Sequence, residues 1–207
     1  MKFYGKGNSR SFRTIWAAEE AGLNYKYIDV EFGGTGEHGT SGEAYRQLNA
    51  QGKVPTMIDD ELVLTESAAI VNYLATKAPS LALIPSPDSK QRALYDQLAF
   101  FVLSDLEQPL WTNGKHRFAI PPEHRVPDVL PTTIWEFNKS QKALVKLIGE
   151  TPEFALGDSF TMADILICHT LAWAESFKFE LFEGLKAYKD RMYARPACKA
   201  AAARLET

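Results

Sequence analysis

Apolar and polar positions in the first eighty residues follow two different periods, which predicts strands and helices in turn. Short runs rich in β-branched or aromatic residues predict strands, and runs with apolar residues three or four positions apart predict helices. The predicted strands cover residues 2–4, 25–30, 54–58 and 62–64, and the predicted helices cover residues 12–21, 43–48 and 67–79. In chain order, these elements form a βαβαββα pattern.

The first predicted helix places Phe12, Ile15 and Trp16 on one face and directs Glu19 and Glu20 to solvent. We expect this helix to end at Gly22, because glycine readily adopts the left-handed conformation that closes a helix. The preceding turn, Asn8-Ser9-Arg10-Ser11, places two hydroxyl groups directly before the helix.

The rest of the chain shows helical periodicity over residues 88–111 and 132–150, and the proline-containing residues 113–129 between them predict a long loop. Thr161 and Asp164 have the spacing of a capping box, in which the carboxylate reaches back to the N–H of the threonine. Asp164 is therefore expected to be structural, although it lies beside an apolar run.

Composition excludes several classes of function. The 207 residues are 45% hydrophobic and carry a net charge of -3, with no basic stripe that would bind nucleic acid. No apolar run reaches the length of about 18 residues that a membrane span needs. Residues 1–20 lack the apolar core of a secretory signal. The sequence therefore predicts a cytoplasmic protein with neither nucleic acid nor membrane as a partner.

The two cysteines argue against chemistry with a protein thiol. Cys168 follows an apolar helical run and Cys198 lies in an alanine-rich segment, so both are expected to be buried and inert. No CxxC motif is present, and no His, Cys or Asp cluster has the spacing of a metal site. We therefore expect no metal and no redox-active cysteine.

The most specific motif is Gln51-Gly52-Lys53-Val54-Pro55-Thr56, with Thr65-Glu66-Ser67 following it. A cis Val54–Pro55 bond would turn the backbone N–H and C=O of Val54 outward, where they can pair with an extended peptide. Ser67 would lie in the first turn of a helix, where unpaired N–H groups bind a carboxylate. Each motif alone is also typical of an ordinary turn or helix cap. Together they predict a site for a short acidic peptide such as glutathione.

This order of elements, with this motif, resembles the amino-terminal domain of the soluble, cytosolic-type glutathione S-transferases, in a bacterial or fungal-like form with a serine-type active-site turn. In the second half, Ser159–Asp164 resembles the family's capping box and Ala194–Ala197 its final-helix signature. The resemblance implies an α/β plus all-α fold. A thioredoxin-like domain (βαβαββα) would cover residues 1–79, a linker 80–87, and an all-helical domain 88–207.

The resemblance also implies an activity, that of a glutathione transferase acting in detoxification. Such an enzyme stabilises the glutathione thiolate for attack on a small, apolar electrophile, and uses glutathione as a co-substrate with no other cofactor. Two alternatives stay open. One is a glutathione-dependent peroxidase or disulfide reductase on the same fold, and the other is a non-catalytic glutathione-binding or scaffold protein.

Family members with a catalytic serine place it in the turn before the first helix, where this chain has Ser9 and Ser11. Counting from Met1 without gaps favours Ser9, and Ser11 is the alternative. Arg10 would either pair with the thiolate or substrate, or lie in solvent. A hydrogen bond to a charged acceptor contributes about 1.5–3 kcal/mol, and about 2 kcal/mol lowers a thiol pKa by about 1.5 units. One serine hydroxyl is therefore sufficient in magnitude.

The resemblance assigns the remaining glutathione contacts residue by residue. Val54 would pair through its backbone with the cysteinyl portion, and Pro55 matches the family's cis-proline. Glu66 and Ser67 match the pair that holds the γ-glutamyl ammonium and carboxylate. Lys53 stands where many members have a polar side chain that reaches the glycyl carboxylate, and its ammonium suits that contact.

The electrophile pocket and the oligomeric state rest on the resemblance as well. The family forms the pocket between the two domains, with apolar groups lining it, and most members are homodimers. The candidates for the pocket are Phe101, Leu106, Trp111 and Trp173, each of which is also a natural core residue. The expected partners are therefore glutathione, a small-molecule electrophile and a second copy of the chain.

Overall fold

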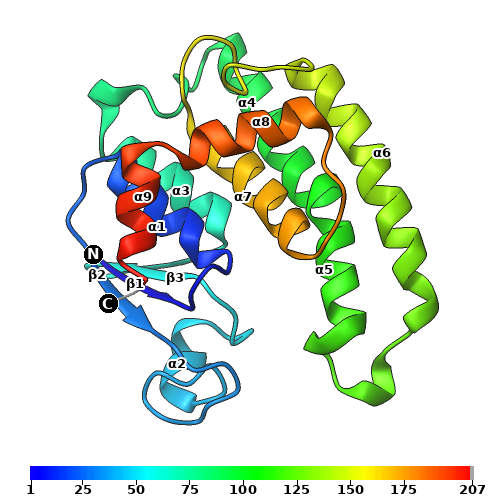
Figure 1. The fold of residues 1–207 in the computed structure, drawn as a ribbon. Coiled ribbons are helices and arrows are strands. Elements are labelled where there is room, and N and C mark those ends of the chain that lie inside the picture. Colours follow the sequence, from blue (N-terminus) through cyan, green and yellow to red (C-terminus); the bar gives the residue numbers. More distant parts are fainter. Residues whose placement is uncertain (206–207) are drawn as a thin grey trace. The chain divides into compact units, whose positions relative to one another are not determined.

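The structure is a computed structural model that describes residues 1–205. The chain forms two compact units, one of residues 1–84 with 193–205 and one of residues 85–192 (Figure 1). The boundary between residues 84 and 85 lies inside the predicted linker. The carboxyl-terminal segment differs from expectation, since residues 193–205 belong to the first unit and not to the helical one.

The first unit contains a four-stranded mixed sheet with the strand order β2-β1-β3-β4. β1 pairs in parallel with β2, whereas β3 is antiparallel to both β1 and β4. The strands are β1 (Lys2–Gly5), β2 (Lys26–Asp29), β3 (Thr56–Asp59) and β4 (Leu62–Thr65). The third strand begins two residues later than predicted, because Pro55 has no N–H to donate to a ladder. The Val54–Pro55 bond is cis, as the motif suggested.

Three helices confirm the βαβαββα pattern: α1 (Ser11–Glu20), α2 (Glu43–Leu48) and α3 (Ser67–Thr76). A further helix, α9 (Pro196–Ala203), adds to the first unit from the other end of the chain. A short 3₁₀ turn, η1 (Pro79–Leu81), follows α3. In Figure 1, α1, α3 and α9 lie on one face of the sheet and α2 lies on the other. Gly22 has φ +64° directly after α1, and the N–H of Leu23 donates to the carbonyl of Ala18, so this helix ends as predicted.

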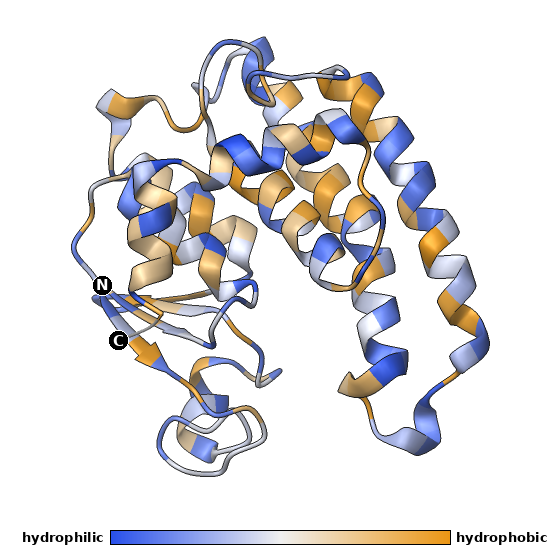
Figure 2. Cartoon of the chain, viewed as in Figure 1, coloured by the Kyte–Doolittle hydropathy of each residue, from blue (hydrophilic) through white to orange (hydrophobic). Residues whose placement is uncertain are grey.

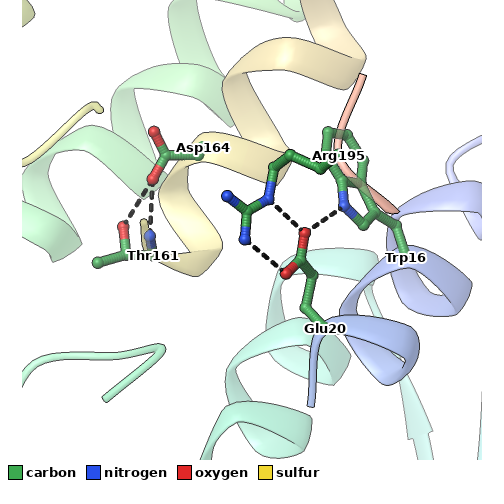
Figure 3. Close-up of polar contacts among 5 residues, drawn as sticks. All are labelled: Trp16, Glu20, Thr161, Asp164 and Arg195. Carbon is green, nitrogen blue, oxygen red and sulfur yellow. Dashed lines mark hydrogen bonds and ion pairs between the residues drawn. The ribbon is translucent and has the colours of Figure 1, made fainter. Parts of the chain in front are cut away.

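Helix α1 is buried more completely than its periodicity indicates. Every residue from Ser11 to Ala18 is buried, because α3 and α9 pack against the helix in addition to the sheet. The expectation that Glu20 faces solvent is wrong. Its carboxylate accepts two hydrogen bonds from Arg195, at 2.6 and 2.8 Å, and one from the indole N–H of Trp16 at 3.0 Å (Figure 3). This cluster ties α9 to α1.

The second unit is helical throughout its regular structure. Its α-helices are α4 (Lys90–Phe101), α5 (Gln108–Gly114), α6 (Leu130–Ile148), α7 (Met162–Ser176) and α8 (Glu183–Tyr193). Two π-helical turns, η2 (Val102–Leu106) and η3 (Lys115–Ala119), follow α4 and α5, and two 3₁₀ turns, η4 (Pro122–His124) and η5 (Pro127–Val129), precede α6. The segment predicted as a long loop is thus mostly short helical turns.

The helix predicted over residues 88–111 is interrupted, and the reason is Pro109. Proline has no N–H and cannot bond to the carbonyl four residues before it, which here belongs to Asp105. The hydroxyl of Ser140 donates to that carbonyl instead, at 2.9 Å. The chain passes through the π-helical turn η2 at this point, and α5 begins after it.

The predicted capping box is confirmed at the start of α7. The carboxylate of Asp164 accepts from the backbone N–H of Thr161 at 2.7 Å and from its hydroxyl at 3.2 Å (Figure 3). Two further donors were not anticipated, the N–H of Ala155 at 2.8 Å and the hydroxyl of Tyr188 at 2.5 Å. Burial raises the pKa of Asp164, and these hydrogen bonds oppose the shift.

Hydropathy along the ribbon agrees with this division into core and surface. Orange, hydrophobic positions predominate on α7, whereas α6 alternates between blue and orange along its length (Figure 2). Most side chains of α7 are buried, and those of α6 are buried on one side only. Among residues 1–205, no helix combines the length and the apolar character that crossing a membrane requires.

Candidate active site

The strand directions bring three predicted segments to one edge of the sheet. Tyr4 pairs with Thr56, and Thr56 also pairs with Thr65. Because β3 is antiparallel to both neighbours, its beginning lies beside the ends of β1 and β4. The residues that follow β1, precede β3 and follow β4 therefore emerge together, and they include Ser9, Val54, Pro55, Glu66 and Ser67.

The two candidate serines differ in accessibility. Their hydroxyl oxygens lie 3.0 Å apart at the start of α1, with Arg10 between them as the N-cap residue. Ser11 is 1% exposed, and its Oγ accepts from the backbone N–H of Lys6 at 3.3 Å. A Cβ on Gly5 would lie 2.8 Å from that Oγ, so the turn encloses Ser11 closely. Ser9 is half-buried and is the more accessible of the two.

Residues 53–56, here called the clamp segment, include unpaired backbone groups. Within residues 1–205, neither the N–H nor the C=O of Val54 has a hydrogen-bond partner, while Pro55 beside it is buried. The side chain of Lys53 is exposed, and its ammonium has no ion-pair partner in the same part of the chain. The backbone of the segment therefore has unsatisfied hydrogen-bonding groups next to a cation that is not paired elsewhere.

Glu66 and Ser67 stand at the beginning of α3. Glu66 has φ +67° and ψ +113°, a conformation that costs a non-glycine residue about 1–3 kcal/mol and is concentrated at functional sites. No side chain caps α3, so the first N–H groups of this helix are open to an anion. The carboxylate of Glu66 is exposed and has no ion-pair partner within residues 1–205. The pair thus presents an unpaired acid beside an uncapped helix start.

Arg13 is a candidate site residue that the sequence analysis did not identify. Its side chain is completely buried, and its guanidinium donates to the Oγ of Ser67 at 3.2 Å, which links α1 to α3. A buried cation beside the start of α3 adds to the attraction of that site for a carboxylate. An arginine between Phe12 and Ile15, within a helix expected to be buried, is the signal that could have revealed it.

The four predicted electrophile-pocket residues lie in the second unit, and they differ in burial and in their neighbours. Leu106 is completely buried in the core, whereas Phe101, Trp111 and Trp173 are half-buried. The ring of Trp173 lies 5.7 Å from that of Phe177. Phe177 also contacts Phe118 and the guanidinium of Arg117, which gives α7 and η3 a shared aromatic and cationic cluster.

One hollow in the first unit lies away from the predicted site. It has a volume of about 720 Å³. None of the predicted glutathione residues lines it, and its walls are formed by Lys6, Gly7, Tyr25, Tyr27, Asp29, Arg204 and Leu205. The sheet edge is identified as the candidate site by its open backbone groups and charges. In residues 1–205, no three His, Cys, Asp or Glu side chains form a group that could hold a metal ion.

We expect both cysteines to be unreactive in the folded protein. Cys168 and Cys198 are buried, and burial raises the pKa of the Cys198 thiol to about 12. Its thiolate at pH 8 is then about one part in ten thousand. An aromatic disulfide reagent should therefore count no thiols in the native protein at pH 8 and two after unfolding in urea. Rapid release of one equivalent from the native protein would contradict the assignment.

Comparisons with known proteins agree with the two-unit fold described above. Residues 1–76 match the family model of the glutathione S-transferase N-terminal domain, and residues 118–196 match that of the C-terminal domain. A zeta class glutathione S-transferase from Euphorbia esula is 33% identical over 164 residues, which cover 77% of this chain and 69% of the relative.

Two solved structures are similar over nearly their whole length. A ternary complex of BphK, a bacterial GST, has a TM-score of 0.87 and 26% identity, with all of both chains covered. A theta class glutathione S-transferase from Xanthomonas axonopodis pv. citri with glutathione bound has a TM-score of 0.77 and 29% identity, over 97% of this chain and 96% of that one. With its thioredoxin-like first unit and helical second unit, the chain belongs to the glutathione S-transferase family.

Proposed function

We propose that this glutathione transferase binds glutathione along the edge of the sheet where β1, β3 and β4 meet, and that Ser9 activates its thiol. The observation that carries the proposal is the convergence there of a half-buried serine, an unpaired Val54 backbone and an uncapped helix start. These groups match the chemistry of an extended peptide with a thiol at its centre and carboxylates at its ends. The bound glutathione in the Xanthomonas relative supports the choice of ligand.

Each part of glutathione has a complementary group in this arrangement. The backbone of Val54 pairs with the cysteinyl portion beside Pro55. The start of α3 at Ser67, supported by Arg13, holds the γ-glutamyl carboxylate, and Glu66 holds the ammonium. Lys53 reaches the glycyl carboxylate.

Ser9 donates its hydroxyl proton in a hydrogen bond to the glutathione sulfur, which favours the thiolate over the thiol. The positive end of α1 adds to this effect. The sulfur then attacks an electrophilic atom of the second substrate, the new bond to sulfur forms, and the leaving group departs with the displaced electron pair. Ser11 maintains the turn, and Arg10 lies close to the developing charge. The proton of the glutathione thiol passes to solvent and not to Ser9, so Ser9 acts as an electrostatic stabiliser and not as a base.

The second substrate and the assembly form the remaining part of the proposal. A small, apolar electrophile contacts Phe101, Trp111 and Trp173, which are half-buried aromatic side chains. The protein works as a cytoplasmic homodimer. Leu94 and Phe100 on α4 are large apolar side chains that are 49% and 69% exposed in the single chain, which supports burial against a second copy.

The activating serine is tested by titrating the thiol of bound glutathione, following thiolate absorbance from pH 5 to 9. We expect a midpoint about 1–2 units below that of free glutathione, corresponding to about 1.5–3 kcal/mol of stabilisation. Ser9→Ala should return the midpoint towards the free value, and Ser11→Ala should change it less. A larger effect of Ser11→Ala would transfer the role to Ser11. Binding of glutathione with an unshifted midpoint in the parent protein would refute thiol activation.

A further inference from the structure

Two buried side chains donate hydrogen bonds to the backbone of the clamp segment. The carbonyl of Lys53 accepts from the hydroxyl of Tyr45 at 2.6 Å and from the side-chain amide of Asn49 at 2.9 Å. Tyr45 lies on α2 and is 1% exposed, and Asn49 follows that helix and is 8% exposed. Two donors on one carbonyl, both buried, fix the direction of the peptide group between Lys53 and Val54.

The same two side chains reach the other end of the clamp. The hydroxyl of Thr56 lies 3.0 Å from that of Tyr45 and accepts from the Asn49 amide at 3.2 Å. Val54 and Pro55 are therefore bracketed by two anchor points, the Lys53 carbonyl and the Thr56 hydroxyl. The two anchor points can be tested separately. The Thr56 hydroxyl is a side-chain group and can be deleted by substitution, whereas the Lys53 carbonyl is a backbone group that loses its bonds only when Tyr45 or Asn49 is changed.

The turn before Lys53 has little room to adjust. Gly52 has φ +60°, and a Cβ there would lie 2.5 Å from the carbonyl oxygen of Thr40 and 2.8 Å from the guanidinium of Arg46. Arg46 in turn donates to the carbonyls of Thr40 and Ala50. The backbone of Lys53 is thus rigidly supported, whereas its ammonium is exposed and has no ion-pair partner within residues 1–205.

We propose that Tyr45 and Asn49 are positioning residues that, through the Lys53 carbonyl, direct the Lys53 ammonium to the glycyl carboxylate, so that the chain prefers glutathione to γ-glutamylcysteine. The inference rests on the proposed glutathione site. The two peptides differ only in the glycyl residue, so both end in a carboxylate, but in γ-glutamylcysteine it is attached directly to the cysteinyl residue. An ammonium on a flexible side chain distinguishes these two positions only if its backbone is held in place. The preference for glutathione therefore depends on two side chains, on α2 and directly after it, that need not contact the ligand themselves.

The test compares binding of glutathione and γ-glutamylcysteine by calorimetry in two matched variants. Tyr45→Phe removes a donor to the Lys53 carbonyl, and Thr56→Val removes the other anchor while leaving both donors to that carbonyl. We expect Tyr45→Phe to weaken glutathione binding about threefold to tenfold and γ-glutamylcysteine binding by less than about twofold. Thr56→Val should leave the ratio of the two affinities unchanged.

Three controls keep the outcomes distinct. Lys53→Ala should abolish the preference, and adding Tyr45→Phe to it should cause no further change in the ratio of affinities. Asn49→Asp removes both donations by the amide but keeps the bond from the Gln51 N–H to Oδ1, so it repeats the test if Tyr45→Phe folds poorly. The pKa of the bound thiol should stay at its parental value in Tyr45→Phe.

Several results would overturn the inference. If Tyr45→Phe weakened the binding of both peptides equally, the hydrogen bonds of Tyr45 would act on Val54 and not on Lys53. If Thr56→Val changed the ratio of the two affinities as much as Tyr45→Phe does, the hydrogen bonds would act only on stability. An unchanged ratio in Tyr45→Phe and Asn49→Asp would also refute it. Failure of the proposed function is a different outcome, in which the parent protein binds neither peptide.

Discussion

Replacing Arg195 by alanine is expected to lower the free energy of unfolding by about 3–5 kcal/mol, because it leaves the carboxylate of Glu20 buried without its cation. The Glu20 side chain is 7% exposed, and Arg195 bonds to both of its oxygens (Figure 3). Within residues 1–205, the indole N–H of Trp16 would then be the one remaining hydrogen-bond donor to that charge. The measurement is urea unfolding followed by tryptophan fluorescence, a signal to which Trp16 is one of four contributors.

Arg204→Ala is the matched control for this variant. Arg204 also pairs with a glutamate of α1, Glu19, but at 3.4 Å and with a side chain that is 63% exposed. Exposed pairs contribute little, typically under about 1 kcal/mol. The two variants should therefore differ severalfold in their effect on the urea midpoint. Equal effects would show that the buried position of Glu20 is not what matters and would contradict the account of how α9 is held.

Asp164→Ala is expected to cost about 4 kcal/mol, considerably more than the loss of about 1 kcal/mol typical of a helix cap alone. The carboxylate accepts from four donors in the second unit. Removing it takes the acceptor from the buried N–H groups of Ala155 and Thr161 and one of the partners from the hydroxyl of Tyr188, at about 1–3 kcal/mol for each lost partner. The thermal midpoint, measured by circular dichroism, should fall by roughly 10 °C or more.

Tyr188→Phe separates the two explanations for that loss. It removes a single donor and leaves the capping box intact, so it should cost about 1 kcal/mol. If Asp164→Ala proved no more damaging than Tyr188→Phe, the carboxylate would be acting as an ordinary cap. The larger estimate, which depends on the donors from Ala155 and Tyr188, would then be wrong.

Local patterns predicted the parts of the fold that depend on neighbours in sequence. The order of strands and helices follows from hydrophobic periods of two and of three to four residues. The end of α1 at Gly22 and the Thr161–Asp164 box depend on residues within one turn of each other, and the structure contains both. The candidate glutathione residues from Lys53 to Pro55 also came from a short motif, and their roles stay predictions.

Several features of the site and of the fold depend on pairs of residues far apart in the chain, and no single stretch of sequence indicates them. The bond from Arg13 to Ser67 joins residues 54 positions apart, and the bonds from Arg195 to Glu20 span 175 positions. The proline at position 109 shows that a local signal can also be overlooked, since it predicts a break that periodicity alone conceals.

The sequence by itself determined the family resemblance, the βαβαββα order and the presence of a helical second half, because periodicity and turn residues act over a few positions. Only the tertiary structure decided that α9 completes the first unit, that Glu20 is buried, and that Tyr45 and Asn49 hold the Lys53 carbonyl. The physical reason is that a charged or polar side chain is stable in the interior only where folding brings its partner to it. Which partner that is depends on packing between distant segments.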